Sequence, residues 1–289
     1  MITYVLAEMG LNMKRILIIG GDKRQLALSD MLKEKGHSVG LQGFQKLGFA
    51  DEDMAAPDYV FLPVPYRNPD GSIKAPYADA PLELTSIVRR YPGSVYVLGR
   101  CDDDARAVMD GHVRYLDFND DEAFLIRNAL LTAQAAICAY AKYAETALCD
   151  TKCLVVGYGR ISKFLCRLLK AHGAKVAAAA RKSRDLELIG NEGLCVVRID
   201  DLAQSLPWAD VIFNTVPAHI FTENELLAIR RDAAFIELAS PPYGMDLKLA
   251  EKCMVNVRIE PSLPGLYFPA SAARAMLHSF EREELKQWN

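Results

Sequence analysis

The sequence contains no pair of cysteines at Cys-x-x-Cys spacing, and no histidine completes a zinc-binding pattern with any of them. Its seven cysteines are an odd number, and most stand in apolar segments, where a free cysteine behaves as a small hydrophobic residue. These absences argue against a zinc site and against a disulfide scaffold. We therefore expect reduced cysteines, no bound metal and a cytosolic protein.

A large charge of either sign is also missing, because the net charge is −3 over 289 residues. Without a global basic field, neither nucleic acid nor an anionic membrane is indicated as a partner. The longest apolar stretch, residues 129–141, is too short to span a bilayer and is interrupted by Thr132 and Gln134. Residues 1–12 contain Glu8 and lack a basic start, so we expect an extension outside the core fold rather than a signal peptide.

The most informative feature present is a glycine turn between an apolar run and a helical pattern. Residues 152–156 form the apolar run and are followed by Gly157-Tyr158-Gly159. This order is typical of the βαβ unit that binds a dinucleotide, in which glycines let the backbone approach the pyrophosphate. The helix N-terminus adds N–H groups and a positive dipole end. The predicted pyrophosphate site consists of Gly157, Gly159, Arg160 and Ile161, with the small Ser162 in place of the third glycine.

The end of the next predicted strand indicates which dinucleotide is bound. Proteins that bind NAD usually place an acidic residue there to hold the ribose 2′-hydroxyl. Here the position holds a cluster of cations and a hydroxyl, namely Arg181, Lys182, Ser183 and Arg184. A carboxylate would repel a 2′-phosphate, whereas these side chains would bind it. The sequence therefore predicts NADP(H) as the cofactor.

Alternating strand and helix patterns run through the whole chain and predict an α/β fold. We expect two doubly wound parallel-sheet, Rossmann-like domains joined by a long interdomain helix. Strands are expected at residues 15–19, 38–41, 59–62, 95–98, 152–156, 174–180, 194–197, 210–214, 234–238 and 254–258. The expected domains are residues 1–119 on the substrate side, 120–150 as interdomain helix, 151–268 for NADP binding, and 269–289 as a C-terminal helix packing on the interdomain region.

Two further segments lie where ligands bind in open α/β sheets, outside the carboxyl ends of the strands. One follows the strand at 210–214 and the other follows the strand at 234–238, although Pro and Gly are common in ordinary turns as well. We expect Thr215, Val216, Pro217 and Ala239 to line the nicotinamide half of the site. His219 is nearby, but a solvated turn histidine explains it.

A second glycine turn, Gly20-Gly21, precedes a predicted helix whose N-cap is Asp22. Lys23 and Arg24 then fall in the first helical turn, where cations oppose the helix dipole unless an anion is near. The pattern is compatible with an anion site, or with side chains that bend into water.

Several segments together resemble the dipicolinate synthase family, and within it the subunit that is linked to NADP. The matching stretches, in order along nearly the whole chain, are residues 18–25, 61–64, 155–160, 180–183, 214–217, 237–240 and 263–265. The Gly-Gly-Asp-x-Arg-Gln segment at 20–25 and the Leu-Pro-Gly segment at 263–265 are the more specific ones. The family tends to carry Thr-x-Glu-Gly in its interdomain helix, whereas this chain has Thr132-Ala-Gln134-Ala. If that glutamate assists proton transfer, Gln134 could not.

The resemblance implies NADP-dependent oxidation of a dihydro- or hydroxytetrahydro-dipicolinate to pyridine-2,6-dicarboxylate during sporulation. It also implies a partner, the smaller flavoprotein-like second subunit of dipicolinate synthase, and a location in the cytoplasm of the mother cell. Because the substrate carries two carboxylates, which suit arginine, the clamp candidates are Arg24, Arg67, Ser240 and Gly265. No base stands out, so the catalytic residues and the exact precursor stay open.

Two other functions share the same two-domain plan. A D-2-hydroxyacid dehydrogenase would need an arginine after the strand at 234–238, where the chain reads Ala239-Ser240-Pro241, and a histidine between residues 255 and 273, where there is none. Both departures argue against this function. A non-catalytic NADP-binding subunit that serves a partner enzyme is the other alternative, and Gln134 keeps it open. The sequence also leaves a homo-oligomer open.

Overall fold

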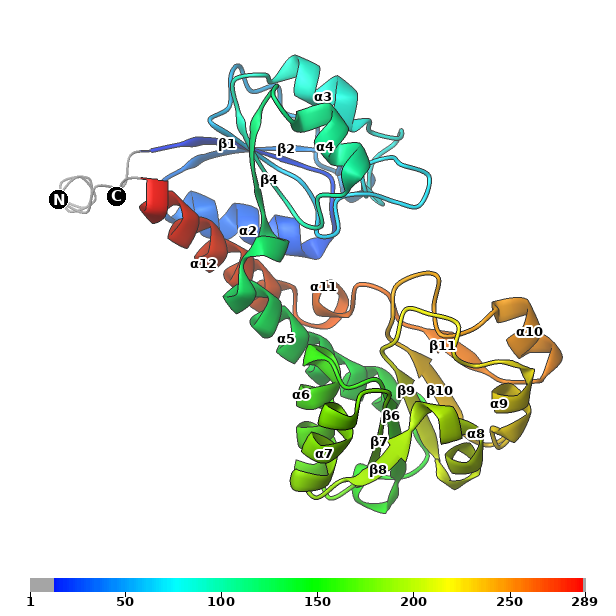
Figure 1. The fold of residues 1–289 in the computed structure, drawn as a ribbon. Coiled ribbons are helices and arrows are strands. Elements are labelled where there is room, and N and C mark those ends of the chain that lie inside the picture. The colour runs from blue at the N-terminus through cyan, green and yellow to red at the C-terminus, as the bar shows by residue number, and fades with distance from the viewer. Residues whose placement is uncertain (1–12, 288–289) are drawn as a thin grey trace. The chain divides into compact units, whose positions relative to one another are not determined.

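The computed structural model describes residues 13–287 and divides into two compact units, each built on its own parallel sheet (Figure 1). The first unit contains the chain up to Arg127 together with the segment from Phe268, and the second contains Asn128–Tyr267. The expectation for residues 1–12 concerns a segment outside the described residues. The predicted α/β fold with two doubly wound parallel sheets is confirmed.

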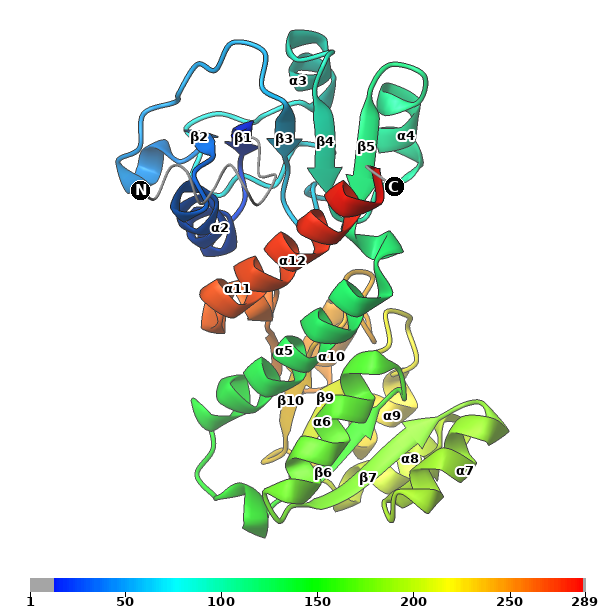
Figure 2. The ribbon, with the colours of Figure 1, turned by 90° about the vertical axis from the view of Figure 1, so that its left-hand side faces the viewer.

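A five-stranded parallel sheet in the order β2-β1-β3-β4-β5 forms the centre of the first unit (Figure 2). Its strands are β1 (Arg15–Ile19), β2 (Ser38–Gln42), β3 (Tyr59–Phe61), β4 (Val95–Leu98) and β5 (Arg114–Asp117). Residues 16–19 of β1 are fully buried. A strand that is hidden on both faces is a continuous apolar run, which is why the sequence alone located it.

Helices cover both faces of this sheet. They are α2 (Lys23–Glu34), α3 (Leu84–Arg90), α4 (Asp103–Met109) and α12 (Pro269–Gln287), with short 3-10 turns at Gln45–Leu47 and Phe118–Asp120. α2 and α12 pack against each other on one face, and α3 and α4 lie on the other (Figure 2). Phe280 of α12 contacts Tyr59 and Phe61 edge-on, with ring centroids 4.8 and 5.0 Å apart. The C-terminal helix is therefore part of the core of the first unit.

The N-terminus of α2 has the cap that the sequence predicts. The Asp22 side chain accepts a hydrogen bond from the backbone N–H of Arg24 (3.0 Å), and the Gln25 side chain accepts one from the Asp22 N–H (2.9 Å). Together they form a capping box, which satisfies backbone donors that the helix leaves open. The helix therefore starts directly behind the Gly20-Gly21 turn.

The connecting helix α5 (Glu122–Ala141) is shorter than the predicted stretch 120–150. At its end the N–H of Tyr143 bonds to the Tyr140 carbonyl three residues back, a tight 3-10-type bond, and the N–H of Ala144 bonds to the same carbonyl. The chain then turns into β6 through a 3-10 turn at Leu148–Asp150, where the Thr151 hydroxyl contacts that of Tyr140 at 3.1 Å. Among the described helices, α5 is long and apolar enough to cross a membrane by length and composition alone, and half of that stretch is buried within the structure.

The second unit contains a six-stranded parallel sheet in the order β11-β10-β9-β6-β7-β8. Its strands are β6 (Lys152–Val156), β7 (Lys175–Ala180), β8 (Cys195–Arg198), β9 (Val211–Asn214), β10 (Ala234–Glu237) and β11 (Val257–Ile259). The first five lie within a residue of their predicted bounds. The prediction for the sixth, 254–258, was shifted, because Cys253 and Val255 still bond back to α10 and Met254 adopts a positive φ of 59°. The strand can begin only after that turn.

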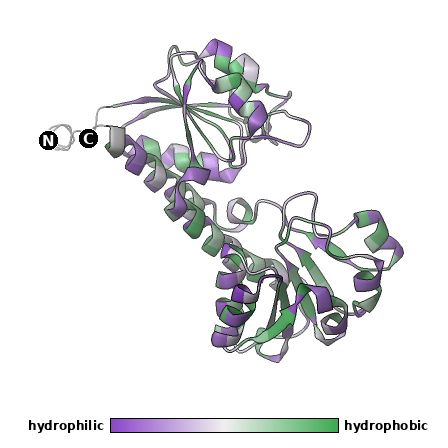
Figure 3. Ribbon diagram, in the orientation of Figure 1, coloured by the Kyte–Doolittle hydropathy of each residue, from purple (hydrophilic) through white to green (hydrophobic). Residues whose placement is uncertain are grey.

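Short helices connect these strands. They are α6 (Arg160–Ala171), α7 (Ser183–Asn191), α8 (Leu202–Ser205), α9 (Glu223–Ala228), α10 (Leu247–Lys252) and α11 (Leu263–Tyr267), with 3-10 turns at Ile199–Asp201 and Leu206–Trp208. The strands are hydrophobic, whereas α7 is largely hydrophilic (Figure 3). In α6, Leu165 and Leu169 are fully buried at helical spacing, as the sequence pattern predicts.

Candidate functional site

The glycine turn of the second unit requires glycine at its first position. Gly157 follows β6 with a φ of +98°, which L side chains rarely adopt. A Cβ atom there would overlap the Thr215 hydroxyl and lie 2.9 Å from Val216 Cγ2. The backbone at Gly157 therefore lies directly against the segment that follows β9.

Ser162 fills the position of the missing third glycine and is fully buried. Its hydroxyl is 2.8 Å from that of Thr215, which in turn donates to the Val156 carbonyl at 2.9 Å. Because the Thr215 hydrogen is used for that carbonyl, Ser162 is the donor to Thr215. A small residue is needed here, as the sequence predicts, and the hydroxyl additionally ties α6 to the strand ends.

The N-terminus of α6 faces open space. Gly159 is the N-cap, it has no side-chain cap, and no atom lies within 4 Å of where its Cβ would be. Arg160 and Ile161 form the first turn of this 12-residue helix. Uncapped N–H groups together with the positive dipole end make such a terminus suitable for phosphate. The geometry fits a pyrophosphate held by residues 157–161.

The predicted cation cluster lies at the end of β7 and the start of α7. Arg181, Lys182, Ser183 and Arg184 are all exposed. Within residues 13–287, none of the three cations forms an ion pair. Arg198, at the end of the neighbouring strand β8, instead pairs with Asp200. Unpaired cations at this position fit an anionic group on the adenosine ribose.

Polar side chains are also buried at the ends of β9 and β10. Asn214 and Glu237 are 0% and 1% exposed, and they stand opposite each other in the register of the two strands. Asn214 Nδ2 donates to the Glu237 carboxylate at 2.8 Å. The sequence pointed to both segments but not to this pair, because only strand order brings residues 214 and 237 together. Thr215, Val216, Pro217 and Ala239 follow directly behind it.

The first clamp candidate, Arg24, is an internal part of the first unit. Its side chain is 5% exposed, and its Nε and Nη2 donate to the two oxygens of Asp22 at 2.8 Å each. Nη2 also donates to the Val64 carbonyl at 2.7 Å. Burial opposes ionisation of Asp22, but Arg24 outweighs it and holds the pKa of Asp22 below its usual value. Arg24 therefore fixes the glycine turn of this unit, and its role as a clamp stays a prediction.

We expect Arg24→Met to destabilise the protein by about 3 kcal/mol, because it leaves the Asp22 carboxylate half-buried without its counter-ion. In the unaltered protein this contribution is complete above the unfolded pKa of aspartate, about 4, and is lost as the pH falls through the lower folded value. Urea unfolding as a function of pH measures both effects. Arg15→Met, which breaks the exposed pair with Asp58 (3.2 Å), is the control and should cost less than about 1 kcal/mol. Equal losses in the two variants would contradict the structural role of Arg24.

The remaining clamp candidates lie in both units. Arg67 is partly exposed and bonds to Asp102 (2.7 Å) and Asp104 (2.5 Å) in the first unit. In the second unit, Ser240 is partly exposed and Gly265 is buried within α11. A role of these residues in a substrate clamp stays a prediction.

The structure also places two residues outside the predicted set. Gln134, which stands where the family resemblance expects a glutamate, is exposed on α5. Arg258 of β11 was not predicted; its guanidinium stacks on the ring of Tyr143, 3.6 Å from the ring centroid. No short motif marks this arginine, because the stacking depends on where α5 ends.

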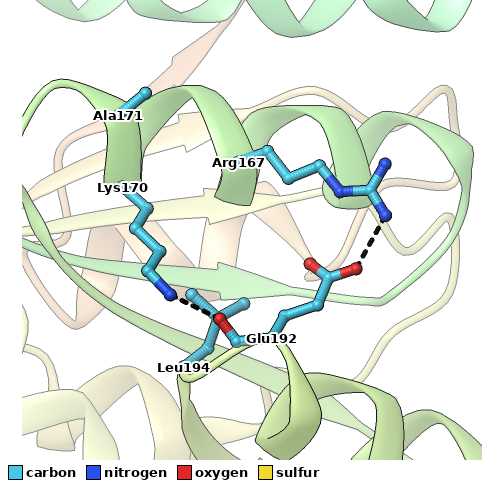
Figure 4. Close-up of a pocket in the computed structure, with 5 residues that line it drawn as sticks. All are labelled: Arg167, Lys170, Ala171, Glu192 and Leu194. Atoms are coloured by element: carbon cyan, nitrogen blue, oxygen red, sulfur yellow. Dashed lines mark hydrogen bonds and ion pairs between the residues drawn. The ribbon is translucent and has the colours of Figure 1, made fainter.

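A hollow of about 420 Å³ lies on the surface between α6 and α7, away from the carboxyl ends of the strands (Figure 4). Both cations that line it bond to Glu192: Arg167 donates to the Glu192 carboxylate at 2.7 Å, and Lys170 donates to the Glu192 carbonyl. In the described part of the chain, no cluster of three His, Cys, Asp or Glu side chains could hold a metal ion.

Comparison with known proteins supports the interpretation of both units. Residues 15–116 match the N-terminal domain of a dipicolinate synthase subunit, and residues 127–242 match the NAD binding domain of D-isomer specific 2-hydroxyacid dehydrogenase. The chain is 27% identical over 277 residues to the corresponding dipicolinate synthase subunit of Bacillus subtilis (strain 168), and the match covers 91% of this chain and 93% of that protein.

Two solved structures of the same dipicolinate synthase subunit are similar along the chain. The one from Bacillus halodurans has a TM-score of 0.82 at 27% identity, and the match covers 94% of this chain and 98% of that one. The one from Bacillus subtilis has a TM-score of 0.79 at 24% identity, with 96% and 99% covered. The family resemblance is thereby confirmed, and the second unit carries an NAD(P)-binding domain of the dehydrogenase type.

Proposed function

Because this chain is related to one subunit of dipicolinate synthase along nearly its whole length, we propose that it is an NADP-dependent oxidoreductase that forms pyridine-2,6-dicarboxylate. The substrate would be a dihydro- or hydroxytetrahydro-dipicolinate. The observation that carries the proposal is the glycine turn of the second unit together with the unpaired cations at residues 181–184.

The residues of the second unit fit this cofactor. Gly157 and Gly159, with the N–H groups of Arg160 and Ile161, would hold the pyrophosphate. Arg181, Lys182, Ser183 and Arg184 would hold the 2′-phosphate, and Thr215, Val216, Pro217 and Ala239 would line the nicotinamide half. When bound, the cofactor supplies a hydride acceptor.

The chain's own contribution to the reaction is binding and orientation. A dihydro-dipicolinate becomes aromatic when it loses a hydride to the cofactor and a proton, whereas a hydroxytetrahydro-dipicolinate must also lose water. Aromatisation makes the reaction strongly downhill, so orientation is the main requirement. The Arg67 side chain is more exposed to solvent than that of Arg24. A substrate carboxylate that binds Arg67 would compete with Asp102 and Asp104 for its guanidinium group. Arg24, Ser240 and Gly265 are the other candidates for holding the two carboxylates.

The proposal extends to the cellular setting. A relative that is named as one subunit of dipicolinate synthase implies another, and we propose the flavoprotein-like second subunit of that enzyme as the partner. The cytoplasm of the mother cell in a sporulating bacterium is the proposed location. A non-catalytic NADP-binding role is the second candidate function, favoured by Gln134 at the position where the family tends to carry a glutamate.

Mixing the purified chain with NADP⁺ and a dihydrodipicolinate precursor tests the proposal. We expect the ultraviolet absorbance of dipicolinate to appear together with NADPH, with the chain alone or at a higher rate with the second subunit. NAD⁺ in place of NADP⁺ is the matched control and should be the poorer acceptor. Product that forms only when an active second subunit is present would support the passive role, and no cofactor reduction under either condition would overturn the proposed reaction.

A further inference from the structure

Two buried polar side chains connect the loops at the nicotinamide side of the second sheet. Asn214 ends β9 and Glu237 ends β10, and the two strands are neighbours in the sheet (Figure 1). Asn214 Nδ2 lies 2.8 Å from Glu237 Oε1 and 3.0 Å from Oε2. The pair is shielded from solvent, so its hydrogen bonds are not exchanged for bonds to water.

The Asn214 side chain also fixes the loop that follows its own strand. Its Oδ1 accepts from the backbone N–H of Val216, and its Nδ2 donates to the Val216 carbonyl, both at 3.1 Å. Both backbone groups of Val216 are thereby held by one amide. These bonds fix the position of the loop 215–217 relative to the end of β9.

The Glu237 side chain does the same for the second loop. Its oxygens accept from the N–H of Ala239 at 2.9 Å and from that of Gly244 at 3.0 Å. These two bonds close the loop 239–244. Every polar neighbour of the carboxylate is a donor, and no cation pairs with it among the described residues. Burial raises the pKa of Glu237, although the two N–H groups and Asn214 act in the opposite direction. These donors are all satisfied only by a side chain whose two oxygens both accept hydrogen bonds, as a carboxylate does.

We propose that the buried Asn214–Glu237 pair is a positioning element, which locks the loops 215–217 and 239–244 together and so sets the nicotinamide half of the cofactor without touching it. The inference rests on the proposed function. The proposed site of the adenosine 2′-phosphate, residues 181–184, follows β7, which lies two strands from β9 on the other side of the sheet's switch point. Val216 lies against the glycine turn, so changes to the pair should affect the pyrophosphate and nicotinamide and spare the adenosine 2′-phosphate.

The fold should survive loss of the pair, because other bonds join the loop 239–244 to residues 219–221. The N–H groups of Ile220 and Phe221 both bond to the Gly244 carbonyl, at 2.9 and 3.0 Å. His219 contacts the Pro242 carbonyl at 3.1 Å. Glu237→Gln places an amide NH₂ opposite backbone donors and releases one end of the loop 239–244. Gly244→Ala perturbs the same pair from the other side, because a Cβ atom there would overlap Asn214 Nδ2.

Titration calorimetry with two ligands tests the proposal. The ligand 2′,5′-ADP reports the adenosine half alone, whereas NADPH reports both halves. For Glu237→Gln and Gly244→Ala we expect 2′,5′-ADP affinity within about twofold of the unaltered protein, and NADPH affinity lower by about tenfold. In turnover, kcat should fall by about 100-fold, more than KM for the substrate changes. Asp246→Asn is the matched control, since Asp246 also accepts two backbone N–H bonds but is exposed and caps α10; its ratio of affinities should not change.

The outcomes distinguish failure of the proposed function from failure of the positioning role. If the unaltered protein binds neither 2′,5′-ADP nor NADPH, the proposed function is overturned. If it binds both, and the two variants lower both affinities equally or leave both unchanged, the positioning role alone is overturned. A selective loss for NADPH in both variants, with Asp246→Asn unchanged, supports it.

Discussion

Replacing Gly157 with alanine is expected to destabilise the second unit and to abolish cofactor binding, the largest effect we predict. The backbone φ of +98° is unfavourable for alanine, and the new Cβ would overlap the Thr215 hydroxyl and crowd Val216. Strain and overpacking together should cost about 3 kcal/mol or more. Chemical denaturation measures the stability, and titration with NADPH measures the binding.

Gly159→Ala separates the binding effect from the folding effect. No atom lies within 4 Å of the Cβ position, and the backbone φ is an ordinary −82°. Because glycine is preferred to alanine at an N-cap, stability should fall, but by no more than about 1 kcal/mol. The methyl group nevertheless occupies the space in which we place the pyrophosphate, so NADPH affinity should fall by about 100-fold or more. A Gly159→Ala protein that binds NADPH normally would show that no phosphate lies over this turn.

Arg181→Asp is expected to lower NADP⁺ affinity by about 100-fold and to leave NAD⁺ affinity within about threefold. The substitution removes a charge-assisted hydrogen bond, worth about 1.5–3 kcal/mol, and sets a negative charge against the 2′-phosphate. NAD⁺ lacks that phosphate and can use the new carboxylate through its ribose hydroxyl. Parallel titrations with the two cofactors measure the difference.

Arg231→Asp is the matched control for this experiment. Arg231 is an exposed arginine that precedes β10, at the amino ends of the strands, whereas Arg181 follows the carboxyl end of β7. Because exposed charges are screened beyond about 10 Å at ordinary salt, the variant should bind NADP⁺ nearly normally. Equal losses of NADP⁺ and NAD⁺ affinity in Arg181→Asp would remove the argument for cofactor choice.

Most of the fold could be predicted from sequence because its signals are local. Buried parallel strands are short apolar runs, so five strands of the second sheet could be located to within a residue. The end of α5 could not, because residues 142–150 contain neither Gly nor Pro. The helix ends at Ala141 although ordinary residues follow it, so its end depends on tertiary context that propensity does not encode.

The sequence by itself determined the two α/β units, the glycine turn at 157–159 and the cation cluster at 181–184, because each depends on residues that are neighbours along the chain. The tertiary structure decided the state of the buried charges. The sequence is compatible with an anion-binding role for Arg24. In the structure its side chain is bound to the Asp22 carboxylate and to the carbonyl of Val64, 40 residues away. Asn214 and Glu237 meet across 23 residues only because β9 and β10 are adjacent. Whether a charged side chain is free to bind a ligand depends on its partners in the folded chain. Strand order decides which partners lie beside it, and no single segment of the sequence specifies strand order.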